Sequence, residues 1–299
     1  GCRVVALAEL RPELGRKVAE KFGVPKVYPD HHALLEDPAV DAVVVVTRRH
    51  ATGPIVLDAL NAGKHVLSEK PMAHTVDQGN RLVAAAEGGP CYAIGYMKRF
   101  DPGVQEGKRT FERLTREKTL GDIATVRAYC FGGNAGRPTD GFVMTDEPRP
   151  DGLDVWPLGP DWLPDDLIDD YDGFLNVNVH ILNIVRYLMG QTPGVSEVNF
   201  NGRDRTVALS FDGFEGVLDL GDIPSDGWSE GVEVEFERGC LAIEFPAPLK
   251  KGDIANIRIR REKSSEFETL AVTETGWSFR RQAEAFVEDV RIGREPLAS

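Results

Sequence analysis

Residues 41–71, DAVVVVTRRHATGPIVLDALNAGKHVLSEKP, contain a strand, a helix and a second strand in succession. The four valines within Asp41–Thr47 do not alternate with polar residues, which is typical of a strand covered on both faces. A helical stretch over Ile55–Ala62 is followed by Gly63, a residue suited to ending a helix, and His65–Ser68 forms the next strand. This succession predicts a parallel sheet with crossover helices.

The same alternation of strands and helices extends over the first hundred residues. Arg3–Ala8 is a predicted strand, and Pro12 suits the first turn of a helix that Gly23 would end. Thr75 and Gln78 match a capping box, in which the glutamine side chain reaches back to the cap residue. The remaining predicted elements here are a short strand near Val27, a short helix at Ala33–Glu36, a helix from Thr75 through Ala86 and a strand at Cys91–Tyr96.

The pattern changes after about residue 103, and we therefore predict two domains, residues 1–103 and 104–299, with Asp101–Gly103 as the hinge. The run VEVEF at 232–236 has one apolar and one acidic face, as in an antiparallel sheet with one wet face. The predicted strands are Ile123–Phe131, Thr206–Phe211, Val217–Leu220, Val232–Phe236 and Ile254–Arg260, and the predicted helices are Leu175–Met189 and Phe279–Ile292.

Charge and composition exclude several classes of protein. The chain has 299 residues and a net charge of −13, which argues against nucleic acid or an anionic membrane as a partner. Its longest aliphatic run, Ala42–Val46, is far shorter than the ~20 residues of a membrane span. The four cysteines are widely spaced and predict reduced thiols in a cytoplasmic protein.

Three stretches carry a resemblance to a known family. AGKHVLSEKP at 62–71, GYMKRFDP at 95–102 and DPAVDAVVVVT at 37–47 are similar to the glucose–fructose oxidoreductase/inositol dehydrogenase (Gfo/Idh/MocA) family of NAD(P)-dependent enzymes. The resemblance implies an α/β protein with a Rossmann-type parallel-sheet domain, followed by an α+β domain with a large open, mostly antiparallel sheet. It also implies a homo-oligomer, a dimer or a tetramer.

One departure from the family pattern concerns the start of the chain. A dinucleotide-binding half normally opens with a strand, a GxGxxG loop and a helix, and no GxGxxG occurs in these 299 residues. Residue 1 falls where the second strand of the family begins. We therefore expect the natural protein to carry roughly 25–35 further N-terminal residues, about one strand–loop–helix unit.

The resemblance assigns cofactor contacts to residues that follow strands. Glu9 occupies the position of an acidic residue that binds the adenosine ribose hydroxyls and repels a 2′-phosphate, which favours NAD. Arg11 lies close enough to pair with a 2′-phosphate, so NADP stays possible. The other expected cofactor contacts are Thr47 and Arg48 at the end of the valine strand and Glu69, Lys70 and Pro71 in the EKP motif.

Catalysis is expected at Lys70 and His180. Pro71 biases Lys70 toward extended backbone, and a nearby oxidised nicotinamide would lower the pKa of the lysine. Asn176 and His180 match the family's Asp-xxx-His pair, with asparagine in place of aspartate; His180 would be the base and Asn176 could only position groups. Lys98 and Asn183 are expected substrate contacts, alongside Asn176.

The predicted function is hydride transfer between a nicotinamide cofactor and a sugar, cyclitol or related polyol. Two alternatives stay open, a catalytically silent dinucleotide- and ligand-binding regulator and a glycosidase that uses NAD transiently. No metal site is predicted. The aspartates between residues 165 and 172 lack the spacing and central glycine of a calcium loop, which favours a solvated acidic loop before the histidine helix.

Overall fold

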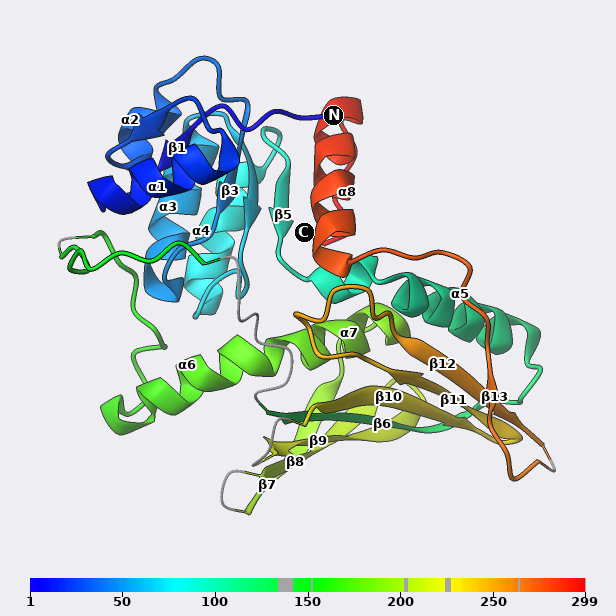
Figure 1. The fold of residues 1–299 in the computed structure, drawn as a ribbon. Helices are drawn as coiled ribbons and strands as arrows, with labels where there is room; N and C mark the ends of the chain where they lie inside the picture. The colour runs from blue at the N-terminus through cyan, green and yellow to red at the C-terminus, as the bar shows by residue number, and fades with distance from the viewer. Residues whose placement is uncertain (134–141, 152, 202–203, 224–226, 263, 299) are drawn as a thin grey trace. The chain divides into compact units, whose positions relative to one another are not determined.

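The structure is a computed structural model that describes residues 1–133, 142–151, 153–201, 204–223, 227–262 and 264–298 (Figure 1). The chain forms two compact units. Unit 1 comprises Gly1–Gly95, Thr139–Asn176 and Ala283–Ser299, and unit 2 comprises Tyr96–Pro138 and Val177–Gln282. The first change of unit, at Gly95/Tyr96, lies near the expected boundary at residue 103, but two later segments return to unit 1.

Unit 1 contains two parallel sheets. In one, β1 (Leu7–Ala8) pairs with β2 (Val27–Tyr28); in the other, the order is β3 (Ala42–Val45), β4 (His65–Ser68) and β5 (Tyr92–Ile94). The Rossmann-type parallel fold predicted from the βαβ pattern is therefore confirmed. The strand expected from residue 3 is shorter, because only its last two residues pair with β2.

The helices of unit 1 begin and end close to the predicted signals, apart from α3 and α6. They are α1 (Pro12–Phe22), α2 (His31–Leu35), α3 (Arg49–Asn61), α4 (Val76–Ala86), nearly all of α6 (Ile168–Val177) and most of α8 (Ser278–Ile292). Gly23 ends α1 with φ 67°, a left-handed conformation that favours glycine.

Helix α3 begins at Arg49 and not at the predicted Ile55, and it runs through Pro54. Proline has no N–H, so it leaves the carbonyl four residues earlier, that of His50, without its helical partner. The backbone N–H of Trp156 donates to this oxygen at 2.8 Å. A distant segment of unit 1 thus replaces the hydrogen bond that the proline removes, which a local reading of the sequence could not anticipate.

The start of α4 follows the predicted capping box only in part. Thr75 caps α4 by accepting from the N–H of Gln78 at 3.2 Å, as expected, but the Gln78 Oε1 accepts from the N–H of His74 and not from that of Thr75.

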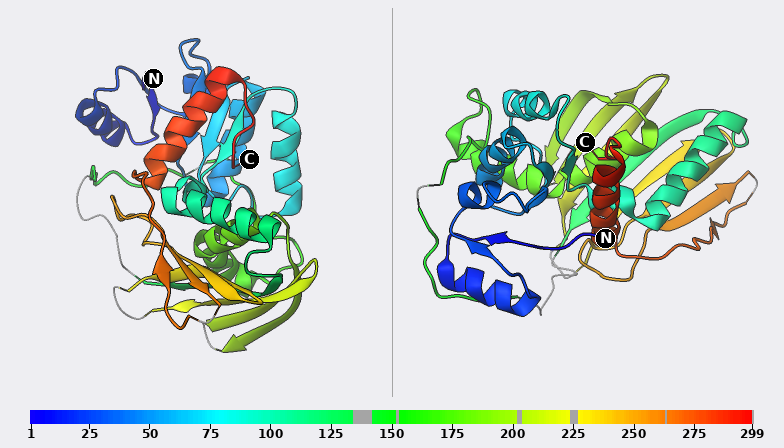
Figure 2. Two further views of the ribbon diagram at one scale, coloured as in Figure 1. Left: turned by 90° about the vertical axis from the view of Figure 1, so that its right-hand side faces the viewer. Right: turned by 90° about the horizontal axis from the view of Figure 1, so that it is seen from above.

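Helix α8 covers strands β4 and β5, as the left-hand view of Figure 2 shows. Phe286 of this helix is buried against Leu67 and Ala93.

Unit 2 is built on one eight-stranded sheet. Its order is β13-β12-β11-β10-β6-β9-β8-β7, and every neighbouring pair is antiparallel except β6–β9. The strands are β6 (Ile123–Gly132), β7 (Gly194–Asn201), β8 (Asp204–Phe211), β9 (Phe214–Asp222), β10 (Ser229–Phe236), β11 (Gly239–Glu244), β12 (Asn256–Arg261) and β13 (Glu268–Thr269). The expected open, mostly antiparallel sheet is confirmed, although β7, β11 and β13 were not predicted.

Two helices of unit 2, α5 (Pro102–Glu117) and α7 (Val179–Met189), pack against this sheet. Helix α5, which was not predicted, lies so close to the strands that a Cβ on Gly107 would meet Ile243 at 2.5 Å. Asp101, in the expected hinge, has a structural role at the start of α5. Its carboxylate is buried, caps α5 by accepting from Gly103 N at 2.8 Å, and accepts from Ala255 N at 2.9 Å.

The single helix predicted over 175–189 is two helices, α6 and α7, interrupted at Asn178. The acidic loop expected before it is largely helical as well, since Asp165–Leu167 form a 3₁₀ turn (η2) that leads into α6. A second 3₁₀ turn, η1 (Met97–Phe100), follows β5. Within the residues that the structure describes, no helix combines the length and apolarity needed to cross a bilayer.

Candidate active site

The EKP motif follows the carboxyl end of β4 and is fixed by its backbone. Ser68 accepts from Gly95 N at 2.7 Å through its carbonyl, and Glu69 N donates to Val45 O at 3.0 Å. The Glu69 carboxylate accepts from the N–H of Lys70 at 3.3 Å, as expected of a residue that orients the lysine backbone. The Lys70–Pro71 peptide bond is cis.

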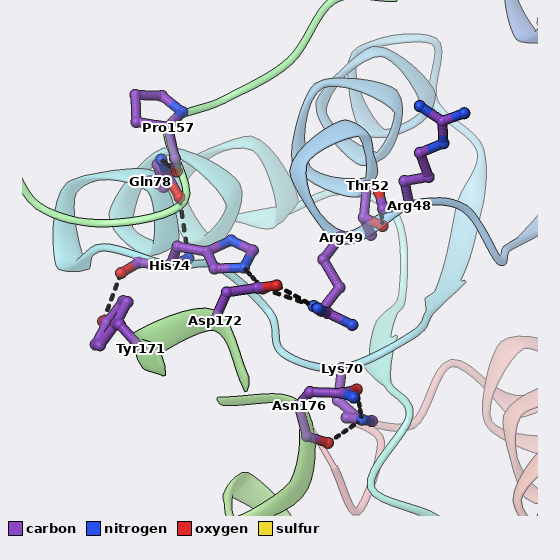
Figure 3. A network of polar contacts seen from close by, with 10 residues as sticks. All are labelled: Arg48, Arg49, Thr52, Lys70, His74, Gln78, Pro157, Tyr171, Asp172 and Asn176. Carbon is purple, nitrogen blue, oxygen red and sulfur yellow. Dashed lines mark hydrogen bonds and ion pairs between the residues drawn. The ribbon is translucent and has the colours of Figure 1, made fainter. Parts of the chain in front are cut away.

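Lys70 contacts Asn176, a residue 106 positions later in the chain, within unit 1 (Figure 3). Its ammonium donates to the Asn176 side-chain oxygen at 3.0 Å and also to the backbone carbonyl of the same residue. Both side chains are partly buried. The structure therefore brings together two of the predicted site residues, one from the end of β4 and one from α6.

A neighbouring network, which sequence reasoning missed, joins α6 to the segments after β3 and β4 (Figure 3). Asp172 accepts from Arg49 through both carboxylate oxygens, one of them 2.6 Å from Arg49 Nε, and its Oδ1 lies 3.1 Å from Nε2 of His74. Tyr171 donates to the His74 carbonyl at 2.7 Å. The expectation that Asp172 belongs to a solvated acidic loop is wrong, because its side chain is only 14% exposed.

Arg49 and Asp172 stabilise each other's charged forms. The hydrogen bond with Asp172 raises the pKa of Arg49, and the same bond lowers the pKa of Asp172. Burial lowers the pKa of His74, although Asp172 opposes the effect. A neutral His74 and a charged Arg49–Asp172 pair thus hold the helix that carries Asn176. Asp172 lies one helical turn before Asn176, which is the only sign of this role in the sequence.

The remaining cofactor candidates of unit 1 lie at the ends of β3 and β1. Thr47 and Arg48 are exposed, and the Thr47 hydroxyl lies 3.0 Å from that of Thr52 at the start of α3. Glu9 follows β1 and its Oε1 accepts from both the backbone N–H and Nε of Arg11, at 3.1 and 2.8 Å. Glu9 and Arg11, both predicted to contact the cofactor, therefore form an ion pair with each other.

The predicted site residues of unit 2 lie on η1 and α7. Lys98 is 6% exposed and its ammonium pairs with the fully buried carboxylate of Glu230. Asn183 is also 6% exposed and accepts from Arg99 Nε at 2.8 Å. Each therefore has a partner within unit 2, and the substrate contacts expected of both stay predictions. His180 lies on α7 and its Nδ1 is buried.

The residues present fit both ends of a nicotinamide dinucleotide. At the end of β1, the half-buried carboxylate of Glu9 is an acceptor of the kind that ribose hydroxyls need. At the ends of β3 and β4, the Thr47 hydroxyl, the Arg48 guanidinium and the Lys70 ammonium offer hydrogen bonds and positive charge to the phosphate and nicotinamide side. No glycine-rich phosphate loop is encoded in the 299 residues.

The four cysteines and the histidines of α2 lie outside this group of residues. All four cysteines are free thiols, as expected, and burial raises the pKa of Cys130 to about 12. His31 and His32 of α2 gather with Asp58 of α3, with His31 Nε2 2.9 Å from the Asp58 carboxylate. Spacing along the chain gave no sign of this group, because the aspartate comes from another helix.

The fold combines a Rossmann-type unit with a second unit built on a large, mostly antiparallel sheet. Residues 1–96 match the family model described as "Oxidoreductase family, NAD-binding Rossmann fold" (GFO_IDH_MocA). This match and the sequence motifs agree on the Gfo/Idh/MocA family for residues 1–96, and the findings support a nicotinamide-dependent dehydrogenase or reductase.

Similar proteins cover nearly the whole chain. It is 24% identical to a myo-inositol 2-dehydrogenase of Thermotoga maritima over 98% of this chain and 82% of that protein. It is also 24% identical to an NAD⁺-dependent scyllo-inositol 2-dehydrogenase of Bacillus subtilis, over 100% of this chain and 82% of that one. The crystal structure of an aldose–aldose oxidoreductase of Caulobacter crescentus with glycerol has the same fold, with a TM-score of 0.74, 23% identity and coverage of 99% and 84% of the two chains.

Proposed function

We propose that the protein transfers hydride between NAD(H) and a CH–OH group of a sugar, cyclitol or related polyol. The observation that carries the proposal is the contact of Lys70 with Asn176, since it joins the EKP lysine to the position of the family's substrate-side carboxylate. The names of the relatives support a polyhydroxylated substrate.

The proposed roles follow from what each side chain can donate or accept. The Lys70 ammonium donates to the substrate hydroxyl that reacts and helps to hold its oxygen as the proton leaves. Asn176 can donate through its amide to a second hydroxyl, but it cannot exchange a proton. His180 accepts the hydroxyl proton in the direction of oxidation, because imidazole is a suitable base near neutral pH.

The cofactor, when bound, supplies the hydride acceptor or donor. Around it, we assign Glu9 to the adenosine ribose, Thr47 and Arg48 to the phosphates, and the EKP backbone to the nicotinamide side. The Asp172 network acts through Asn176: because Arg49 and His74 fix α6, they fix the distance of Asn176 from the end of β4. Asp172 is therefore a positioning residue in this proposal.

One observation favours a second candidate, a dinucleotide- and ligand-binding protein without turnover. Asn176 occupies the position of a carboxylate that could exchange a proton, and both of its oxygens already accept from Lys70. A protein of this kind would bind NAD(H) and polyols but show no reaction with any of them.

A substrate panel distinguishes the two. The protein is incubated with NAD⁺ or NADP⁺ and a series of inositols, aldoses and anhydro sugars, and reduced nicotinamide is followed by absorbance. We expect the protein to oxidise at least one polyol, and we expect the rate to fall at least a hundredfold in Lys70→Met and in His180→Asn. The rate should be retained in Lys64→Met, a matched change on the loop before β4. Binding of NADH without turnover of any polyol would favour the second candidate, and no binding of either nucleotide would overturn both.

A further inference from the structure

The N-terminus of α1 is capped by a carboxylate from a distant segment of unit 1. Glu147 accepts from the backbone N–H groups of Glu13 and Leu14, at 3.0 and 2.8 Å, one with each carboxylate oxygen. The Thr145 hydroxyl donates to the same carboxylate at 2.9 Å. In the right-hand view of Figure 2, the green chain of this segment runs beside the blue helix α1.

These contacts determine the electrostatics of the turn after β1. Burial by itself would raise the pKa of Glu147, but the two backbone hydrogen bonds outweigh it and the pKa is lowered, so the carboxylate is charged. The hydrogen bond with Glu9 raises the pKa of Arg11, and the charge of Glu147 adds to the effect. Arg11 therefore lies in the field of two carboxylates.

A Rossmann-type site distinguishes NAD from NADP at this same turn. In a Rossmann unit, the adenosine ribose lies beside the turn that follows the second strand, and its 2′-substituent meets the side chains there. A 2′-phosphate requires positive charge and N–H donors at this place. Here the Arg11 N–H and guanidinium are bound to Glu9, and the Glu13 and Leu14 N–H groups are bound to Glu147.

We propose that Glu147 is a second cofactor-specificity residue, which acts with Glu9 to reject a 2′-phosphate and makes the site selective for NAD(H). This inference rests on the proposed function, because it requires that the dinucleotide binds beside Glu9. A cap from another segment is also a restraint on that segment, so the residues around Thr145 stay beside the adenosine end of the site.

The test measures affinity and not turnover. Dissociation constants for NADH and NADPH are obtained by nicotinamide fluorescence for the unaltered protein, for Glu147→Gln and for Asp146→Asn. Glutamine keeps an oxygen that can accept from an α1 N–H but lacks the charge. Asp146 is exposed in the same segment, so its variant changes the net charge equally without touching α1.

We expect Glu147→Gln to tighten NADPH binding about tenfold, equivalent to about 1.4 kcal/mol, while NADH affinity changes less than twofold. Asp146→Asn leaves both constants within twofold. Discrimination against NADPH in the unaltered protein also weakens as salt rises, because exposed charges are screened. A purely structural cap would change both affinities equally, and the salt dependence of the discrimination would then be the same in Glu147→Gln as in the unaltered protein.

Three results would overturn the inference. An unchanged ratio of the two affinities in Glu147→Gln, or an equal change in Asp146→Asn, removes Glu147 as a specificity residue and leaves the proposed function standing. Failure of the unaltered protein to bind either nucleotide removes both proposals together. Thermal unfolding of each variant shows that the proteins compared are folded.

Discussion

Replacing Asn176 with aspartate tests the contact at the centre of the candidate site. The change is nearly isosteric and places a carboxylate oxygen where the amide oxygen now accepts from Lys70 Nζ at 3.0 Å. A negative charge at that distance stabilises the ammonium form of Lys70 relative to the neutral amine. More base is then needed to deprotonate Lys70 in the variant.

The size of the effect follows from the distance. At 3.0 Å, two unit charges interact by about 1.4 kcal/mol in bulk water and by about 5.5 kcal/mol at an effective dielectric constant of 20. At 1.36 kcal/mol for each pH unit, these limits correspond to about 1 and about 4 pH units. Both side chains are only partly buried, so we expect the titration midpoint of Lys70 to rise by about 1–2 pH units.

Competitive labelling of amines measures this midpoint without requiring a substrate. The protein is treated with a trace of acetic anhydride over a range of pH, and acetylation of the peptide that contains Lys70 is quantified by mass spectrometry. Asn80→Asp is the matched control, because Asn80 is exposed on α4 and the same charge is introduced there. If a substrate is found, the basic limb of the pH–rate profile should move in the same direction.

A midpoint that stays within about 0.3 pH units of the unaltered protein would refute the reasoning, since even the dielectric constant of bulk water predicts a change of about 1 pH unit at 3.0 Å. An equal rise in Asn80→Asp would refute it too, because the effect would then reflect net charge and not the contact. Retained cofactor affinity shows that Asn176→Asp is folded.

Three other predictions concern stability. Glu230→Gln leaves the buried Lys98 ammonium without its counter-charge and should lower the free energy of unfolding by about 3–5 kcal/mol in urea titrations, whereas replacing both residues by apolar ones should restore most of it. Burial lowers the pKa of His74, so the unfolded chain binds more protons near pH 6; stability should fall as pH drops below about 6.5, and His74→Gln should flatten that slope in thermal melts. Gly103→Ala places a Cβ 2.0 Å from the backbone carbonyl oxygen of Ala255 and should lower the free energy of unfolding by about 1–3 kcal/mol. Gly173 lies in open space on α6, so Gly173→Ala should raise the free energy of unfolding by about 0.5–1 kcal/mol. Equal melting temperatures for the two variants would contradict the packing argument.

Local patterns in the sequence predicted the elements that local physics controls. The four valines before Thr47 and the helix and strand after them led to the parallel sheet of unit 1, and the alternation at 232–236 led to the antiparallel sheet of unit 2. Gly23 and Thr75 ended and began helices where expected. The EKP motif predicted Lys70 as a site residue and the Asp-xxx-His pattern predicted Asn176, and the structure places the two in contact.

Local patterns failed where one segment completes another. Helix α3 continues through Pro54 because Trp156 supplies the lost hydrogen bond, and Asp172 is part of a buried network because Arg49 and His74 reach it. Lys98 was expected to face a substrate, and its ion pair with Glu230, 132 residues away, was not predicted. None of these partners leaves a periodic signal near the residue it affects.

The sequence by itself thus determined the class of fold and predicted the lysine of the candidate site, because periodicity, end signals and a short motif act over a few residues. Only the tertiary structure decided which charges meet. Arg49 and Asp172 are 123 residues apart, and Glu147 is 134 residues from the α1 N–H group that it caps. Contacts at such separations depend on how the elements pack, so the pairing of each charged side chain is a property of the folded chain.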